Sequence, residues 1–298
     1  MIKTTEEQNR LSNDLDTLEI NQILNIINNE DKNIPNIINN KIEDIADLIK
    51  AAILKMQIGG RLFYVGCGTS GRLGVLDASE CPPTFSVDRN VVIGIIAGGN
   101  TALTQSVENA EDSEEDGKNI IIKHNVSNKD VVIGISASST ASFVEGALKQ
   151  AFNVNALTAL LCCNNIENKN YVNHLLSIVV GPEVISGSTR MKAGTATKLI
   201  LNMISTTIMI KLNKTYGNYM VDLTVTNNKL LDRGIRIVSE LTNLSYTDSK
   251  LILNKAKGKV KNAILMYLSN INYKKSETIL DNYSGNLRNA LNASILKK

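Results

Sequence analysis

The sequence predicts an α/β fold, in which a parallel sheet covered by helices is followed by a small helical subdomain. Short β-branched runs alternate with helical-looking segments from residue 61 onward, a pattern typical of a parallel sheet buried on both faces. After about residue 226 no convincing strand follows. The chain of 298 residues has room for one large α/β domain and a small appendage. We therefore expect an N-terminal helical segment at 1–60, the sheet domain at 61–225 and a C-terminal helical subdomain at 226–298.

The first elements follow from local patterns. Residues 19–58 show an apolar helical period interrupted by the polar break NEDKN, with Pro35 near the start of a second helix. The Gly59–Gly60 pair ends that helix, as glycine does at many helix C-termini. The strands are expected at 61–66, 91–97, 130–136, 155–162 and 174–180.

The later part of the chain is predicted to be helical. A long apolar-striped helix is expected over about 188–214, packed against the sheet or against a second subunit, and several short helices are expected over 240–298. The long helix carries more large apolar side chains than the surface of one small domain tolerates: Leu199, Ile200, Met203 and Ile204. We therefore expect an obligate homodimer.

Composition excludes several classes of function. The net charge is +3 with acids and bases interleaved, which gives no reason to expect nucleic acid as a partner. The N-terminus MIKTTEEQNR lacks the apolar stretch of a signal peptide, and the longest apolar runs are too short to span a membrane. Four cysteines without C-x-x-C spacing and two distant histidines do not indicate a metal site or a disulfide framework. We expect a cytoplasmic protein without a bound metal.

A glycine-rich loop, YVGCGTSGR, follows the first predicted strand and contains G-x-G-x-x-G at Gly66, Gly68 and Gly71. A dinucleotide fold would place an acidic residue at the end of the second strand, but that strand ends VVIGIIAGGN. The loop also carries Thr69 and Ser70. Hydroxyls, backbone N–H groups and a following helix N-terminus suit a single phosphate dianion. The loop is therefore predicted to bind a phosphate group rather than a dinucleotide.

A second hydroxyl cluster, ISASSTASF, follows the third predicted strand and offers Ser136, Ser138, Ser139 and Thr140. Loops at the carboxyl ends of parallel strands converge on one crevice in an open sheet. The alternative is that these residues only form turns and helix caps, as most Ser and Thr do. Two clusters at equivalent strand ends favour a binding site for a small sugar phosphate.

Three motifs closely resemble the N-acetylmuramic acid 6-phosphate etherases: YVGCGTSGRLGVLDASECPPTF, ENAEDS and GSTRMKAGTATKLILNMIST. The resemblance covers nearly the whole chain, including the N-terminal TTEEQN and the helical tail. It implies a sugar isomerase (SIS) domain and a homodimer. It also implies removal of the D-lactyl ether from the substrate, which yields N-acetylglucosamine 6-phosphate and D-lactate.

One loop departs from the family pattern. Family members usually show Ser-Gly-Arg-Thr-Pro after the third strand, whereas this chain has SSTAS from Ser138 to Ser142. The phosphate-binding role therefore carries over to Ser138 only. For Ser136, Ser139 and Thr140 the expectation depends on hydroxyl chemistry alone.

Two glutamates are candidates for acid–base catalysis, which needs two carboxyl groups and no metal or other cofactor. The resemblance assigns the catalytic positions to Glu80 and Glu111. From the residues alone, Glu111 opens an acidic run, which is usually solvated surface. Glu108 would share its helix face, where two neighbouring acids can raise a pKa or can equally face water. Glu108 is also expected to contact the substrate. Glu80 is expected at the end of a helix that Pro82–Pro83 stops, roughly 15 Å from its start. That distance is long for one hexose phosphate. Either the helix is bent or broken, or Glu80 serves a site shared with another subunit.

Two cations precede the long helix, Arg190 and Lys192 in GSTRMKAG. One of them could clamp the phosphate or the lactyl carboxylate, since Arg suits planar recognition of a carboxylate. The alternative is a pair of surface cations.

Two other functions remain open on the same residues. An aldose–ketose sugar-phosphate isomerase would use the same fold and the same abstraction of the C2 proton. A non-catalytic sensor resembling the glucokinase regulatory protein would bind the sugar phosphate without turnover.

Overall fold

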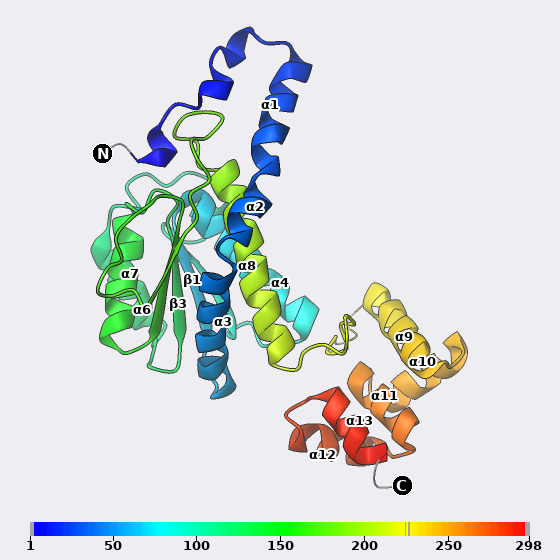
Figure 1. Cartoon of the computed structure of the whole chain (residues 1–298). Helices are drawn as coiled ribbons and strands as arrows, with labels where there is room; N and C mark the ends of the chain where they lie inside the picture. Colours follow the sequence, from blue (N-terminus) through cyan, green and yellow to red (C-terminus); the bar gives the residue numbers. More distant parts are fainter. Residues whose placement is uncertain (1–2, 224, 226, 296–298) are drawn as a thin grey trace. The chain divides into compact units, whose positions relative to one another are not determined.

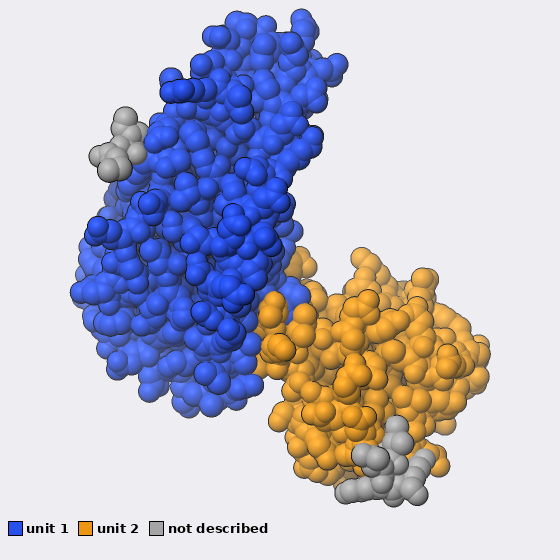
Figure 2. Space-filling view, viewed as in Figure 1, with its two compact units in different colours: residues 1–79, 89–206 blue, residues 80–88, 207–298 orange. Residues whose placement is uncertain are grey.

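The computed structural model describes residues 3–223, 225 and 227–295 (Figure 1). The chain divides into two compact units, which Figure 2 distinguishes by colour. The first comprises Met1–Ser79 and Arg89–Thr206, and the second comprises Glu80–Asp88 and Thr207–Lys298. The domain boundaries predicted after residues 60 and 225 stay a prediction.

A five-stranded parallel sheet forms the centre of the first unit. Its strands are β1 (Leu62–Gly66), β2 (Val92–Ile96), β3 (Val131–Ile135), β4 (Leu157–Cys162) and β5 (His174–Ser177). The predicted α/β class is confirmed, and each of these five strands lies within the residue range predicted for it. The order is β2-β1-β3-β4-β5, so β1 and β3 are neighbours and Gly66 pairs with Ile135. The loops that follow these two strands therefore start side by side.

The segment before the sheet is helical, as predicted. After three 3-10 turns at Thr4–Glu6, Arg10–Ser12 and Leu15–Thr17 come α1 (Ile20–Lys32), α2 (Ile34–Asn39) and α3 (Ile42–Gln57). The expected break falls at Asn33, but the expectation of one continuous second helix was wrong. That helix is interrupted between α2 and α3, at two consecutive asparagines, a residue type with low helix propensity.

Helices cover both faces of the sheet, because alternate strand residues point to opposite sides. Phe63, Val65 and Val132 pack on one face with α6 (Glu114–Lys123) and α7 (Ser142–Asn153). On the other face α4 (Gly68–Phe85) approaches so closely that a side chain at Gly74 would meet Tyr64. The helix α3 packs on β4 and β5.

The long helix α8 (Lys192–Lys211) lies within the expected range. Asp77 of α4 accepts hydrogen bonds from Asn202 (2.6 Å) and Ser205 (3.1 Å) of α8, which fixes the two helices together. Ile200 and Ile204 are fully buried inside this chain. These two side chains therefore need no second subunit to bury them, whereas Met203 is 37% exposed, and the homodimer stays a prediction. The length and composition of α8 alone would allow a membrane span, but more than half of its apolar window is buried inside the chain.

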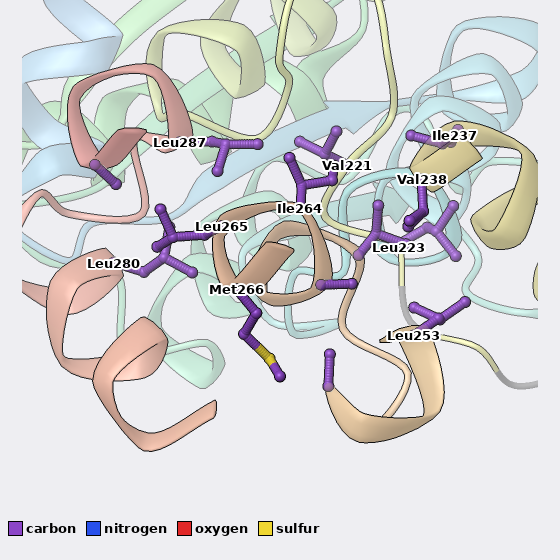
Figure 3. Packing of buried hydrophobic residues seen from close by; sticks show 14 of the residues in the cluster. Val221, Leu223, Ile237, Val238, Leu253, Ile264, Leu265, Met266, Leu280 and Leu287 are labelled. Atoms are coloured by element: carbon purple, nitrogen blue, oxygen red, sulfur yellow. The ribbon is translucent and has the colours of Figure 1, made fainter. Parts of the chain in front are cut away.

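The second unit is a helical bundle, as predicted for the tail. Its helices are α9 (Asn228–Thr242), α10 (Tyr246–Lys255), α11 (Val260–Ser269), α12 (Tyr273–Asn282) and α13 (Leu287–Ile295). The other four helices pack on α11, whose residues Ile264 and Leu265 are fully buried. Figure 3 shows these two side chains among the core that they share with Val221 and Leu223.

Candidate functional site

The turn from β1 into α4 is tight, and its glycines explain why. A Cβ at Gly71 would lie 2.6 Å from Ile96 Cγ1 and 2.7 Å from Gly66 O, and a Cβ at Gly66 would lie 2.7 Å from Gly71 N. Gly68, with φ +51°, is the first residue of α4. The first N–H groups of a helix have no partner inside the helix. The loop therefore presents those of Gly68, Thr69 and Ser70 at the carboxyl end of β1.

The second loop leaves β3 at Ser136 and is held by its own hydroxyls. Ser139 has φ +57° and donates its side-chain hydroxyl to Ser138 O (2.6 Å). The Oγ of Ser138 and the Oγ1 of Thr140 share a hydrogen bond of 2.6 Å. Ser136 Oγ accepts a hydrogen bond from Ala141 N (3.5 Å), just before α7 begins. Some of these hydroxyls therefore shape the turn, which is the alternative role considered for them.

The two loops enclose one cavity of about 130 Å³. Its lining includes these residues predicted from the sequence: Gly68, Thr69, Ser70, Glu111, Ser136 and Ser138. Thr189, from the turn before α8, also lines it and was not predicted. A neighbouring hollow of about 450 Å³ shares Gly68 and Glu111 and adds Glu108. Part of each hydroxyl cluster and one of the two glutamates thus lie around a common space. The predicted residues Ser139 and Thr140 do not line it.

Glu111 lies in a turn and not on a helix. The short helix α5 (Thr101–Thr104) ends before it, and α6 begins only at Glu114. The expectation that Glu108 and Glu111 share a helix face was therefore wrong, because Asn109 between them has a left-handed φ of +59°. The backbone of Glu111 is fixed, since its carbonyl accepts a hydrogen bond from Phe143 N (2.9 Å).

Glu80 lies on α4, on an exposed part of that helix. The expectation that the prolines end the helix was wrong, since α4 runs through Pro82 and Pro83 to Phe85. Proline removes a hydrogen bond but its fixed φ matches a helix. Glu80 comes twelve residues after Gly68, which is about 18 Å along an α-helix. It does not line the cavity at the start of α4.

The two cations before α8 have different surroundings. Lys192 is buried, and its ammonium is paired with Glu30 of α1. Its backbone N–H and that of Ala193 donate to the buried carboxylate of Glu183, each at 2.9 Å. Burial raises the pKa of Glu183, although these two N–H groups oppose the shift. Arg190 is exposed, and neither cation lines the cavity.

The N-terminal segment contacts the second loop, which the sequence analysis did not predict. Lys3 donates its ammonium to Ser138 O (2.8 Å). Thr5 is fully buried and is held by Asn164, whose side chain also donates to Ala137 O (3.1 Å). In the sequence, the motif TTEEQN is the only indication that this segment belongs to the site. No local pattern connects it with a loop 135 residues later.

Cys67 lines both hollows. Burial raises its pKa to about 12, with further contributions from the charges of Glu111 and Asp112. The thiol is therefore protonated at neutral pH and is a poor nucleophile. In the part of the chain that the structure describes, no group of three or more His, Cys, Asp and Glu side chains is placed to hold a metal ion.

Two family models match separate parts of the chain. Residues 44–152 match the N-terminal SIS domain of the glucokinase regulatory protein, and residues 217–270 match the C-terminal lid domain of that protein. A solved structure of a protein from Escherichia coli CFT073 superposes with a TM-score of 0.49 at 15% identity, over 67% of this chain and 97% of that chain. So loose an overlap supports no argument about function.

Three bacterial relatives match most of the chain, and each is named N-acetylmuramic acid 6-phosphate etherase. The protein of Caldanaerobacter subterraneus is 49% identical, over 88% of this chain and 86% of its own length. The Clostridium acetobutylicum protein is 47% identical over 88% and 87%, and the Staphylococcus epidermidis protein is 45% identical over 89% and 90% of the two chains. At this identity and coverage, the chain belongs to the N-acetylmuramic acid 6-phosphate etherase family.

Proposed function

We infer that this protein is an N-acetylmuramic acid 6-phosphate etherase, a carbon–oxygen lyase that releases D-lactate and leaves N-acetylglucosamine 6-phosphate. Relatives of 45–49% identity carry this name. The observation within the chain that supports it is the shared cavity, which combines a phosphate-type loop, a second hydroxyl loop and the carboxylate of Glu111.

The phosphate group binds at the start of α4. Thr69, Ser70 and the N–H groups of the first helical turn face the same cavity as Ser138. A helix N-terminus carries a partial positive charge and attracts an anion. Ser136 and Thr189 offer further hydroxyls in the lining.

The chemistry is an elimination followed by hydration. In the open-chain sugar C1 is an aldehyde, so the hydrogen on C2 is acidic and a base can remove it. The C3–O bond then breaks, and an acid protonates the departing oxygen of lactate. Water adds to the resulting C2=C3 bond, with its hydroxyl on C3 and a proton on C2. General acid–base groups supply every proton transfer.

Glu111 acts as the base and Glu80 as the acid. Glu111 is supported as the base by its place in the lining of the cavity and by its fixed backbone. Glu80 lies far along α4 from the same cavity, and α4 is not broken between them. We therefore assign Glu80 to a site that it shares with a second copy of the chain.

The homodimer is also supported by exposed apolar side chains on the N-terminal arm. Ile20 and Leu24 of α1 are 74% and 58% exposed, and Leu11 of the preceding turn Arg10–Ser12 is similarly exposed. Large exposed apolar side chains such as the pair on α1 indicate an interaction surface. The dimer works in the cytoplasm, where phosphorylated sugars are retained.

The direct test is a coupled assay for D-lactate released from N-acetylmuramic acid 6-phosphate. The etherase releases D-lactate and N-acetylglucosamine 6-phosphate in equal amounts. An isomerase would convert a sugar phosphate without releasing lactate, and a sensor would bind the substrate without turnover. Either of those results would overturn the proposed activity.

A further inference from the structure

The second unit contains a cavity of about 290 Å³ that the etherase chemistry does not use. Its apolar wall includes Val221, Leu223 and Leu280, which Figure 3 shows as part of the core of this unit. Its polar lining consists of Ser86, Lys214, Asp222, Lys259, Lys261, Asn262 and Ser284. No residue of this lining occurs in the cavity between the two hydroxyl loops.

Two of the lysines share one carboxylate. Asp222 Oδ2 lies 2.9 Å from Lys261 Nζ and 3.3 Å from Lys214 Nζ. The side chain of Lys261 is only 7% exposed, and its ammonium also donates to Asn213 O (2.7 Å). Lys259 has a separate partner, Glu277, at 3.0 Å. Within the lining, Asp222 is thus the acid that offsets Lys214 and Lys261 together.

This arrangement leaves an excess of positive charge in a concave, partly apolar space. Burial lowers the pKa of Lys261, and the charge of Lys214 lowers it further, although Asp222 acts in the opposite direction. A buried charge without full compensation is costly. The surrounding segment 207–298 carries fifteen Lys and Arg against six Asp and Glu, so its field attracts anions.

We propose that this cavity binds a small anion with a phosphate group, held by the ammonium groups of Lys214 and Lys261. A bound dianion compensates the charge that Asp222 leaves unpaired, and an ammonium binds phosphate as a point charge. One water takes about 30 Å³ of liquid volume, so the cavity has room for a phosphate and a small organic group. This site is distinct from the etherase site and does not depend on the activity proposed there.

The test uses a fluorescent reporter placed beside the cavity. The chain has no tryptophan, so Tyr283→Trp, next to the lining residue Ser284, gives a signal from this unit alone. The full-length variant is titrated with inorganic phosphate, with glucose 6-phosphate and with glucose, all at constant ionic strength set by potassium chloride. We expect a saturable change with one or both phosphates and no change with glucose. Tighter binding of glucose 6-phosphate identifies a phosphate ester as the ligand, and equal or tighter binding of inorganic phosphate identifies the free ion.

Lysine variants in the reporter background decide whether the signal comes from the cavity. Lys214→Met is expected to weaken phosphate binding by about tenfold or more, because it removes a charged hydrogen-bond donor. Lys250→Met, on the exposed side of α10, is the matched control and should bind as the reporter does. Lys261→Met should abolish phosphate binding, and circular dichroism shows whether this variant is folded. If Lys261→Met is unfolded, Lys214→Met alone decides the test. A signal that never saturates, or that both Lys214→Met and Lys250→Met retain, overturns the proposal.

Discussion

At the scale of single residues, two carboxylates in different surroundings divide the proposed chemistry. Glu111 lines the cavity between the two hydroxyl loops, from a turn that Phe143 anchors, whereas Glu80 stands on the exposed side of α4. If Glu111 removes the C2 proton, every later step depends on it. If Glu80 protonates the lactyl oxygen, its loss affects only cleavage.

The two roles can be separated by following the C2 hydrogen in deuterium oxide by NMR. Glu80→Gln should still exchange this hydrogen but release little lactate, and Glu111→Gln should lose exchange and release together. Substrate affinity should stay near that of the wild type, since both groups act in the transition state. Glu115→Gln, an exposed acid of α6, is the control and should keep full activity. Full lactate release by either variant removes that residue from the mechanism. If the C2 hydrogen still exchanges in Glu111→Gln but not in Glu80→Gln, the two residues have the opposite roles.

A second prediction at this scale concerns Ser138. Ser138→Ala removes a hydroxyl that we expect to bind the phosphate, and a hydrogen bond to a charged group is worth about 1.5–3 kcal/mol. KM should therefore rise by about tenfold or more while kcat changes little. Ser113→Ala is the control: Ser113 caps α6 through Asp116 N, so its loss should cost about 1 kcal/mol of stability and leave KM unchanged. An unchanged KM in Ser138→Ala would contradict the phosphate assignment.

At the scale of elements, Arg61 and Asp130 join the starts of β1 and β3. Asp130 Oδ2 lies 2.8 Å from Arg61 Nη2, and Oδ1 accepts hydrogen bonds from Arg61 N and Nε. Ser127 N donates to the same carboxylate (2.8 Å). The far ends of these two strands carry the two hydroxyl loops, so the clamp fixes the relative register of the strands at the opposite edge of the sheet.

We expect Asp130→Asn to lower the free energy of unfolding by about 1.5–3 kcal/mol, since hydrogen bonds to a buried charged group are lost. Urea denaturation at constant m-value measures this loss. Asp47→Asn is the control: Asp47 forms an exposed pair with Lys50, and its loss should leave the midpoint within error. Equal stability of Asp130→Asn and the wild type would contradict the clamp.

The same clamp gives a pH dependence. Burial raises the pKa of Asp130, but the hydrogen bonds from Arg61 and Ser127 outweigh burial, and the net pKa is lowered from 3.8. The folded state then binds this proton more weakly than the unfolded state does. Its stabilisation is present above the unfolded pKa and is lost as the pH falls below it through the folded pKa. The stability difference between the wild type and Asp130→Asn should therefore shrink in acid below about pH 4, and a difference that grows there would contradict this assignment.

At the scale of the whole molecule, the second subunit is expected to cover the exposed apolar side chains of α1. The helix α1 has no buried residue within this chain, and Ile20 and Leu24 lie one turn apart on it. At its C-terminal end α1 is fixed to the start of α8 by the pair between Glu30 and Lys192. An anchored helix with an open apolar face is suited to contact another copy.

Sedimentation velocity at micromolar concentration should show a dimer for the wild type. Placing charges on the apolar face with Ile20→Glu and Leu24→Glu together should produce monomers and reduce lactate release, because Glu80 then lacks a partner site. The control Asn25→Glu adds a charge at an exposed position on another side of α1. This variant should remain a dimer. An active monomeric wild type would contradict the shared site.

The sequence by itself determined the main secondary-structure elements and the hydroxyl chemistry of the loops after β1 and β3. The five strands, the helical tail and the glycines at 66 and 71 follow from local patterns, because strand formation and tight turns depend on neighbouring residues. The hydroxyl residues after β1 and β3 were likewise identifiable, since parallel strands bring their carboxyl ends to one edge of a sheet.

Only the tertiary structure decided how distant segments meet. Lys3 contacts Ser138, Glu111 lies in a turn, and α4 continues past Pro82. Each outcome depends on contacts far along the chain: the crossover order puts β1 beside β3, and packing overrides the local preference against proline in a helix. Local patterns therefore indicate which elements form and which loops carry hydroxyl groups, whereas the residues that meet around the cavity depend on long-range packing that no short stretch of sequence encodes.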